Sequence, residues 1–233
     1  MFRCHQFITG DFKTRKVFLE DKVYGLALDA LTKACSDILI VSPDKTKVLL
    51  GKRKVHPQPD WWLVGGRGRP GLSPNEAAAA NTKRELKIDA NPERFKVVGS
   101  YNLVWEFRQQ HPQKNGTADI STVHALVLTE EEFKSSESNM FEKQEYSEVK
   151  WIPIKDILKK EASICYSPAL RQFVHDLCSR FKFEDLTNAV ENPNASDEDV
   201  GKLARELIKW HGPAESSATQ VYFNESTRSY KIE

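Results

Sequence analysis

The sequence predicts an α+β fold, an α/β/α sandwich in which a mixed sheet is packed between helices, with an extension at each end. Three observations support this fold class. Short apolar runs separated by turn residues indicate strands over residues 37–53 and again over residues 95–152. A glycine-rich loop at residues 65–71 leads directly into an alanine-rich helix. A further helix follows the last strand, and this order of elements is typical of α+β domains.

The first strands form a hairpin. Residues 1–34 are assigned to an N-terminal extension, in which residues 24–31 are a short helix or a short strand. Residues 37–41 and 47–53 are apolar runs on either side of a Ser-Pro-Asp-Lys turn, so they predict two paired strands.

A helix and the remaining strands follow. Ser73 and Pro74 are the residue types of a helix N-cap and first helical position, and they predict a helix over residues 75–87. Asn91-Pro92 stops it. The strands expected after this helix cover residues 95–101, 103–107, 120–128 and 148–152.

The C-terminal part is predicted to contain one domain helix and an appendix. Ser167 and Pro168 start a helix that is expected to end near Phe181. The main domain is therefore placed at residues 35–182 and the C-terminal extension at residues 183–233. The extension is expected to hold a helix capped by Ser196 and ended by Gly212-Pro213, and a hairpin of residues 221–223 and 230–232.

The composition excludes several classes of protein. A net charge of +1 gives no bulk attraction for nucleic acid. No apolar run approaches the roughly 18 residues of a membrane helix, so no membrane partner is expected. The four cysteines form no CxxC pair, which favours free thiols over a zinc cluster. We expect a cytoplasmic protein; mitochondrial import and a homodimer stay open.

The glycine-rich loop is the strongest candidate for a ligand site. Gly65 and Gly66 allow the backbone to approach a ligand closely, and the helix start that follows favours anions. Arg67 and Arg69 present forked donors that match phosphate oxygens. Arg53, at the end of the second hairpin strand, is a further phosphate contact. Together these residues predict a site for a diphosphate.

Two acids at the end of the following helix suggest a divalent cation. Glu85 and Asp89 are four residues apart, so on a helix they share one face. Mg²⁺ (or Mn²⁺) takes oxygen ligands and keeps several waters, so few carboxylates suffice. The predicted metal ligands are Gly66, Glu85 and Asp89, and both acids are predicted to be catalytic. The alternative is a solvated helix face.

Other candidate residues lie further along the chain. Trp105 is expected to stack on a base or sugar. His124 lies mid-strand, as a core histidine or as part of the substrate pocket wall. Glu142, Glu145 and Glu148 precede the last predicted strand, and a glutamate there, with Glu145 the choice, is the expected general base.

The loop and helix resemble the box of the Nudix hydrolases, G-x5-E-x7-R-E-U-x-E-E-x-G-U with U aliphatic. Two registers are open. The first begins at Pro70, keeps Glu76 as the box's first acid, and places Asp89 in the glutamate pair and Asn91 on the last glycine.

The second register begins at Gly66 and loses the first box glutamate to Leu72. It places Arg84-Glu85 on the glutamate pair and Lys87 on the last glycine. Glu85 is the acid that both registers keep. The resemblance implies a Nudix fold and Mg²⁺-dependent hydrolysis of a nucleoside diphosphate linked to another moiety.

Within that family, residues 49–53 and 116–124 are similar to the GDP-mannose mannosyl hydrolases, which cleave GDP-sugars at the sugar carbon. That branch has a histidine base where this chain has Tyr146. The resemblance covers residues 35–178 and implies an NDP-sugar, such as a GDP-sugar, as substrate. The alternative is a catalytically weak or inactive nucleotide- or RNA-binding protein, with capped RNA open as a ligand.

Overall fold

The computed structural model describes residues 4–13, 15, 17–136, 145–159, 161, 165–211 and 218–233. The chain forms two compact units, Met1–Ile154 and Lys155–Glu233, which are described separately. Within the described residues, no helix combines the length and the apolar character needed to cross a membrane.

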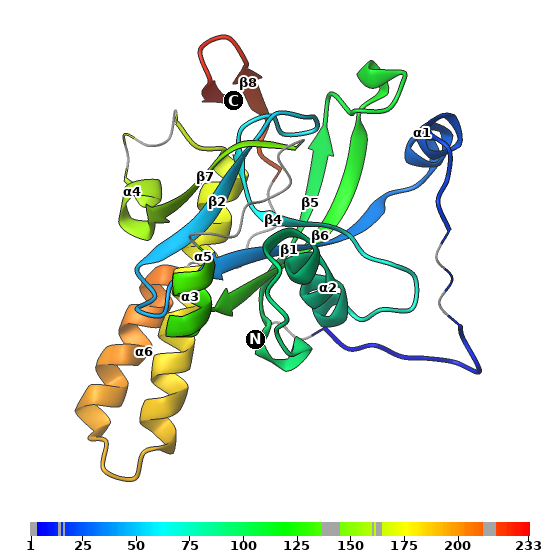
Figure 1. The fold of residues 1–233 in the computed structure, drawn as a ribbon. Coiled ribbons are helices and arrows are strands. Elements are labelled where there is room, and N and C mark those ends of the chain that lie inside the picture. The colour runs from blue at the N-terminus through cyan, green and yellow to red at the C-terminus, as the bar shows by residue number, and fades with distance from the viewer. Residues whose placement is uncertain are drawn as a thin grey trace. The chain divides into compact units, whose positions relative to one another are not determined.

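The first unit is built on a mixed sheet, which confirms the predicted α+β class (Figure 1). β1 and β6 are parallel, and the other pairs among the described strands are antiparallel. The sheet order is β3-β2-β1-β6-β5, with β4 paired to β1 and β7 paired to β2. The strands are β1 Lys33–Val41, β2 Lys47–Arg53, β3 Trp61–Trp62, β4 Val64–Arg67, β5 Lys96–Trp105, β6 Thr117–Val127 and β7 Tyr146–Pro153.

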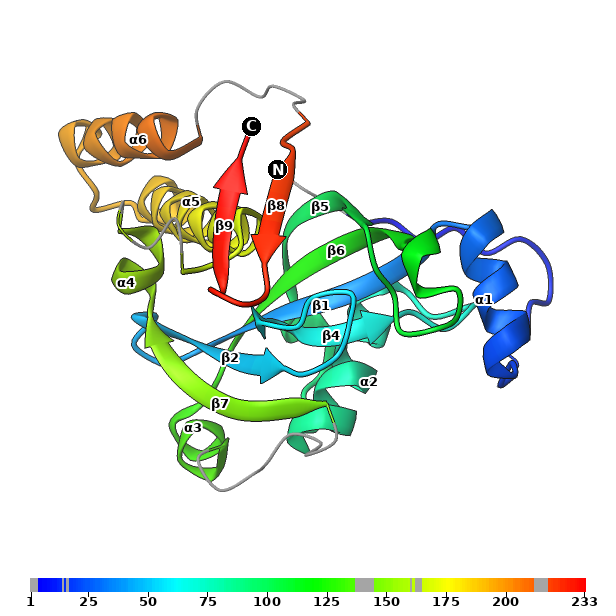
Figure 2. The same cartoon turned by 90° about the horizontal axis from the view of Figure 1, so that it is seen from above.

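β1 is the central strand. Residues 38–41 are fully buried, as expected for a strand covered on both faces. β6 pairs with the whole of β1 on one side (Figure 2). On the other side, β1 changes its antiparallel partner from β4 to β2 between Ile38 and Ile40. β2 and β4 therefore diverge from neighbouring points on one strand.

α2 (Pro74–Leu86) packs on β1 and β4. Its start agrees with the sequence prediction, because Ser73 and Glu76 form a reciprocal capping box. Its end is one residue earlier than predicted. Lys87 adopts a left-handed conformation with φ of 60° and ends the helix.

α1 (Asp21–Ala30) resolves the choice left open for the N-terminal extension in favour of a helix. It is tied to the loop after β5 by Arg108, whose side chain is 1% exposed. Arg108 Nη1 lies 2.6 Å from Asp29 Oδ1 and donates to Gly116 O at 3.2 Å. This buried guanidinium holds the helix against the body of the unit.

β5 corrects a second prediction, because it is one continuous strand where two were expected. Asn102, the residue between the two predicted strands, keeps the ladder by pairing with Ile120 of β6. A polar residue on the outer face does not interrupt a strand when its backbone stays paired. The short helices of this part of the chain are η1 Pro92–Arg94, η2 Gln113–Asn115, α3 Glu130–Ser136 and α4 Ile154–Leu158.

The second unit contains α5 (Pro168–Glu191), α6 (Asp197–His211) and the hairpin β8 (Val221–Asn224) and β9 (Ser229–Ile232). The prediction that the first of these helices ends near Phe181 is wrong, because α5 continues until Asn192-Pro193 breaks it. The proposed boundary between residues 182 and 183 therefore falls inside a helix. Lys182 pairs with Glu206 of α6 at 2.6 Å. Gly212-Pro213 lies outside the described residues.

Candidate active site

The first unit contains a cleft of about 150 Å³ between the diverging strands. Three cationic side chains line it: Lys33 starts β1, Arg53 ends β2 and Arg67 ends β4. Arg53 Nε is buried, and no described residue accepts a hydrogen bond from it. The structure thus brings two of the predicted phosphate contacts, Arg53 and Arg67, to one cleft and adds Lys33.

Carboxylates line the same cleft, from β1 (Asp37), β6 (Asp119) and the residue before β7 (Glu145). Asp119 is 2.8 Å from Lys33 Nζ and accepts a hydrogen bond from Trp105 Nε1 at 3.0 Å. Glu145 is exposed at the rim. Cations and carboxylates are equal in number among the lining residues that the structure describes. The cleft therefore suits a ligand with few charges rather than a polyphosphate.

Aromatic side chains complete the lining. Trp105, the residue predicted to stack on a base or sugar, lines the cleft and meets Trp62 edge to face with ring centroids 5.5 Å apart. Tyr24, from α1, lies under the guanidinium of Arg67 at 5.0 Å. Tyr24 thus makes the N-terminal helix part of the site.

Gly65 faces Asp37 across the β1–β4 pair. Its φ of 156° lies in a region that L side chains rarely adopt, and a Cβ there would be 2.2 Å from Asp37 Oδ1. A glycine is therefore required for β4 to pass this carboxylate.

Asp37 is a buried acid on the cleft wall. Burial raises its pKa to about 6, opposed by a hydrogen bond from Ser121 Oγ at 2.5 Å. Asp119 raises the pKa further, and Arg53 lowers it. This carboxyl group therefore exchanges its proton near neutral pH, which is unusual for an aspartate.

An Asp37→Asn substitution is expected to make the free energy of unfolding less dependent on pH. The folded state holds this proton more tightly than the unfolded state, so the stability contribution is present below about pH 4 and lost as the pH rises to about 6. At about 1.4 kcal/mol per pKa unit, the loss is at most about 3 kcal/mol. Urea unfolding of both proteins from pH 4 to pH 8 measures it. If the free energy of unfolding changes equally with pH in both proteins, the raised pKa assigned to Asp37 is contradicted.

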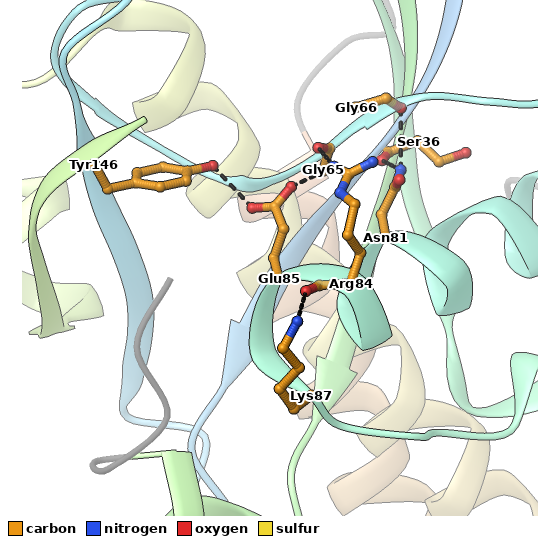
Figure 3. A network of polar contacts seen from close by, with 8 residues as sticks. All are labelled: Ser36, Gly65, Gly66, Asn81, Arg84, Glu85, Lys87 and Tyr146. Atoms are coloured by element: carbon orange, nitrogen blue, oxygen red, sulfur yellow. Dashed lines mark hydrogen bonds and ion pairs between the residues drawn. The ribbon is translucent and has the colours of Figure 1, made fainter. Parts of the chain in front are cut away.

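Glu85 lies in the last turn of α2, and its side chain is 4% exposed (Figure 3). Arg84 Nη2 lies 2.6 Å from its Oε1 and also donates to Gly65 O at 3.1 Å. Tyr146 donates to Oε2 at 2.9 Å, and its ring fills the space left by Gly51, where a Cβ would lie 2.5 Å away. Burial raises the pKa of Glu85, and the hydrogen bond from Arg84 opposes this rise.

Asn81 lies one turn earlier on α2. Its side-chain Nδ2 donates to Gly66 O and to Ser36 O, both at 3.1 Å. Its side chain therefore ties the glycine loop to β1, and the Gly66 carbonyl already accepts a hydrogen bond (Figure 3).

The backbone decides between the two box registers. The last glycine of the pattern follows the helix end, where a left-handed residue is commonly found. Lys87 has φ of 60°, whereas Asn91 has φ of −59°. This favours the second register, which places Asn81, Arg84 and Glu85 on three acid positions of the pattern. One of those three residues is an acid.

Asp89 requires a correction. The prediction that it shares a helix face with Glu85 is wrong, because α2 ends at Leu86. The Asp89 side chain is 75% exposed, and its carboxylate pairs with Lys83 at 2.6 Å. The described residues contain no group of three or more His, Cys, Asp or Glu side chains that could hold a metal ion. The helix-face arrangement predicted for the ligand set Gly66, Glu85 and Asp89 is not formed, because Asp89 lies beyond the end of α2.

Two predicted substrate contacts lie elsewhere. His124 is fully buried, 3.2 Å from Asn75 Oδ1, and burial lowers its pKa to about 4. It is a neutral core histidine, outside the cleft lining. Arg69 is exposed beyond the end of β4 and also does not line the cleft. Glu142 lies outside the described residues.

Sequence reasoning missed Tyr24, Lys33, Asp37 and Asp119 as cleft residues. Asp37 carried a usable signal, because it is a charged residue at the start of an apolar strand. Tyr24 and Lys33 carried none, because nothing local shows that the N-terminal extension reaches the cleft.

Comparison with known proteins identifies a family. The sequence model described as NUDIX domain matches residues 33–173. No curated protein matches the chain.

Solved structures are similar at low identity. A MutT protein from Methanosarcina mazei Go1 is 19% identical, covers 66% of this chain and 95% of its own, and has a TM-score of 0.45. A MutT NUDIX hydrolase from Burkholderia pseudomallei is 18% identical over 63% of this chain and 98% of its own, with a TM-score of 0.46. A C. elegans Ap4A hydrolase is 15% identical over 64% and 98%, with a TM-score of 0.43. Likeness at this level says nothing about substrate.

Proposed function

The chain belongs to the NUDIX domain family, the Nudix hydrolases of nucleoside diphosphate derivatives, and from this premise we propose that it hydrolyses a nucleoside diphosphate linked to a sugar. The observation that carries the proposal is the cleft lined by Lys33, Arg53 and Arg67 together with buried carboxylates. Arginine forks bind phosphate oxygens, and carboxylates accept hydrogen bonds from sugar hydroxyls.

The size and charge of the cleft support this substrate class. A volume of about 150 Å³ is smaller than the roughly 300–1,000 Å³ of sites that enclose a drug-sized ligand. It therefore suits the diphosphate and sugar, with the base lying over the rim near Tyr24 and Trp105. Each further phosphate would meet Asp37 and Asp119, and like charges at short range are unfavourable. A GDP-sugar, as the sequence resemblance implies, meets these requirements.

Glu145 is the proposed general base. It is exposed at the rim of the cleft and can accept a proton from a water held near the substrate. Glu85 is buried and holds Tyr146 and Arg84, so we assign it a positioning role. Arg53 and Arg67 bind the diphosphate and neutralise charge that develops on it.

Nudix hydrolases generally use divalent ions such as Mg²⁺, and the residues of this chain do not fit such an ion. Arg84 already occupies Oε1 of Glu85 and the carbonyl of Gly65, and Asp89 is paired with Lys83 on the surface. The mechanism proposed here therefore contains no metal-dependent step.

A second candidate function is nucleotide binding without hydrolysis. The Arg84–Glu85 pair favours it, because the guanidinium neutralises this buried carboxylate and both of its oxygens accept a hydrogen bond. The phosphate contacts are compatible with either function.

Turnover decides between the two functions. Purified protein is incubated with GDP-mannose, UDP-glucose, ADP-ribose, a dinucleoside polyphosphate and capped RNA, and products are separated by chromatography. We expect turnover of a nucleotide sugar, reduced about 100-fold or more by Glu145→Gln. Glu148→Gln, which removes a carboxylate paired with Lys150, is the matched control and should be near wild type. Binding of GDP without turnover of any compound would establish the binding function.

Heavy-oxygen water then identifies the bond that breaks. Label in the released sugar shows attack at carbon, and label in a phosphate shows attack at phosphorus. The resemblance to the GDP-mannose branch predicts label in the sugar.

A further inference from the structure

The last turn of α2 contains a fixed cation. Arg84 Nη2 lies between Glu85 Oε1, at 2.6 Å, and Gly65 O, at 3.1 Å. These lengths are those of hydrogen bonds from a guanidinium, and the pair with the carboxylate is charge-assisted. Figure 3 shows the guanidinium between the helix end and the glycine loop.

In the described part of the chain, the Glu85 carboxylate and the carbonyls of the first two glycines of the loop each accept hydrogen bonds. Mg²⁺ requires near-octahedral oxygen ligands at about 2.0–2.1 Å. Glu85 Oε2 accepts from Tyr146, and Gly66 O accepts from Asn81. The second register places Asn81 and Arg84, like Glu85, on acid positions of the pattern. In this chain the side chains of Asn81 and Arg84 are hydrogen-bond donors instead.

The surrounding charge also opposes a divalent ion. Lys83, Arg84 and Lys87 are close in sequence at the end of α2, and Lys87 Nζ donates to Arg84 O at 2.7 Å. Glu85 is buried, and a buried charge needs a partner of opposite sign. The adjacent guanidinium of Arg84 is that partner. A dication bound to Glu85 would be repelled by the adjacent guanidinium, although the Glu145 carboxylate is also near enough to interact with Glu85.

We propose that Arg84 replaces the divalent cation of this site, so that the cleft binds a nucleoside diphosphate without metal. Its side chain is 48% exposed, and in the described part of the chain only its Nη2 forms hydrogen bonds. Arg84 does not itself line the cleft, but its Nη2 would lie 3.4 Å from a Cβ built on the lining residue Gly66, so Nε and Nη1 are available to a phosphate that reaches past the glycine loop. The proposal has two parts. The metal half, that no divalent ion binds at Glu85, is independent of the substrate. The phosphate half, that Arg84 contacts a nucleoside diphosphate, rests on the proposed function.

Mn²⁺ binding tests the metal half, by electron paramagnetic resonance of the full chain. Any Mn²⁺ binding by wild-type protein should be unchanged in Glu85→Gln. Arg84→Glu places a carboxylate beside Glu85 and should create a Mn²⁺ site at least about tenfold tighter than any in Arg84→Gln, a difference of about 1.4 kcal/mol. Lys83→Glu is the charge-matched control, because Lys83 is exposed and paired with Asp89. It should add no binding that depends on Glu85.

Calorimetry with GDP tests the phosphate half. Wild-type affinity should be the same in EDTA and in excess Mg²⁺, and Arg84→Gln should weaken it about tenfold in both. Circular dichroism confirms that each variant is folded.

The outcomes separate the two proposals. Glu85-dependent Mn²⁺ binding by wild-type protein, failure of Arg84→Glu to bind Mn²⁺, or a tenfold loss of GDP affinity in EDTA would each overturn the inference. If the wild type binds no nucleoside diphosphate at all, the proposed function fails, and the Mn²⁺ measurements still decide whether Arg84 stands in place of the metal.

Discussion

A Gly65→Ala substitution is expected to destabilise the protein by about 3–5 kcal/mol. Two effects add. The backbone has φ of 156°, where a side chain costs about 1–3 kcal/mol. The new Cβ would also lie 2.2 Å from Asp37 Oδ1 and 2.6 Å from Asp37 Cα. Because part of this clash is with backbone, a rotamer change cannot relieve it, and β1 and β4 must separate. Chemical unfolding monitored by tryptophan fluorescence measures the loss.

Gly68→Ala is the matched control for this experiment. Gly68 lies in the same loop, but its φ is not positive and the nearest atoms to an added Cβ are 3.6 Å and 3.8 Å away. These are ordinary contacts, so the change should stay within about 1 kcal/mol. If both variants lose the same free energy of unfolding, the clash with Asp37 is not the cause of the loss.

An Arg53→Met substitution is expected to weaken binding of GDP about 10- to 100-fold with little change in folding. Arg53 Nε is buried beside the cleft with no hydrogen-bond partner among the described residues, so its donor has no structural bond to lose. A hydrogen bond between charged groups contributes about 1.5–3 kcal/mol, which corresponds to that range of affinity. Methionine keeps an apolar stem of similar length.

Lys52→Met controls for the loss of one positive charge. Lys52 is the neighbour of Arg53 on β2, so its side chain points to the opposite face of the strand. Its ammonium lies 5.6 Å from the ring of Trp61, which is not a lining residue of the cleft. Its affinity for GDP should be near wild type. If both variants lose affinity equally, long-range charge rather than contact explains the effect.

Local chemistry made much of the fold predictable. The start of α2 follows from a serine cap, a proline and four alanines, each of which acts within one turn. The end of α2 was misplaced because Lys87 adopts a left-handed conformation, which lysine seldom does. That single dihedral angle removed Asp89 from the face of Glu85.

The candidate site was predictable only where its residues are close together in the sequence. Gly65, Gly66 and Arg67 are consecutive in sequence, and their pattern alone identified the loop. Asp37 and Tyr24 reach the cleft through strand pairing and through the packing of α1, which depend on distant contacts. An ion pair of Arg84 that holds the loop was predictable, but its partner was not, because the sequence position does not reveal that the guanidinium turns onto the neighbouring carboxylate.

Helix α1 sets the shortest fragment that keeps the cleft intact. The family match begins at residue 33, and a truncation made there would retain every strand of the large sheet. It would remove the ring on which Arg67 rests and the carboxylate that neutralises the buried Arg108. Ligand screening on such a fragment would sample a cleft that lacks the Tyr24 side chain from its lining. Expression for crystallisation or screening should therefore begin before Asp21.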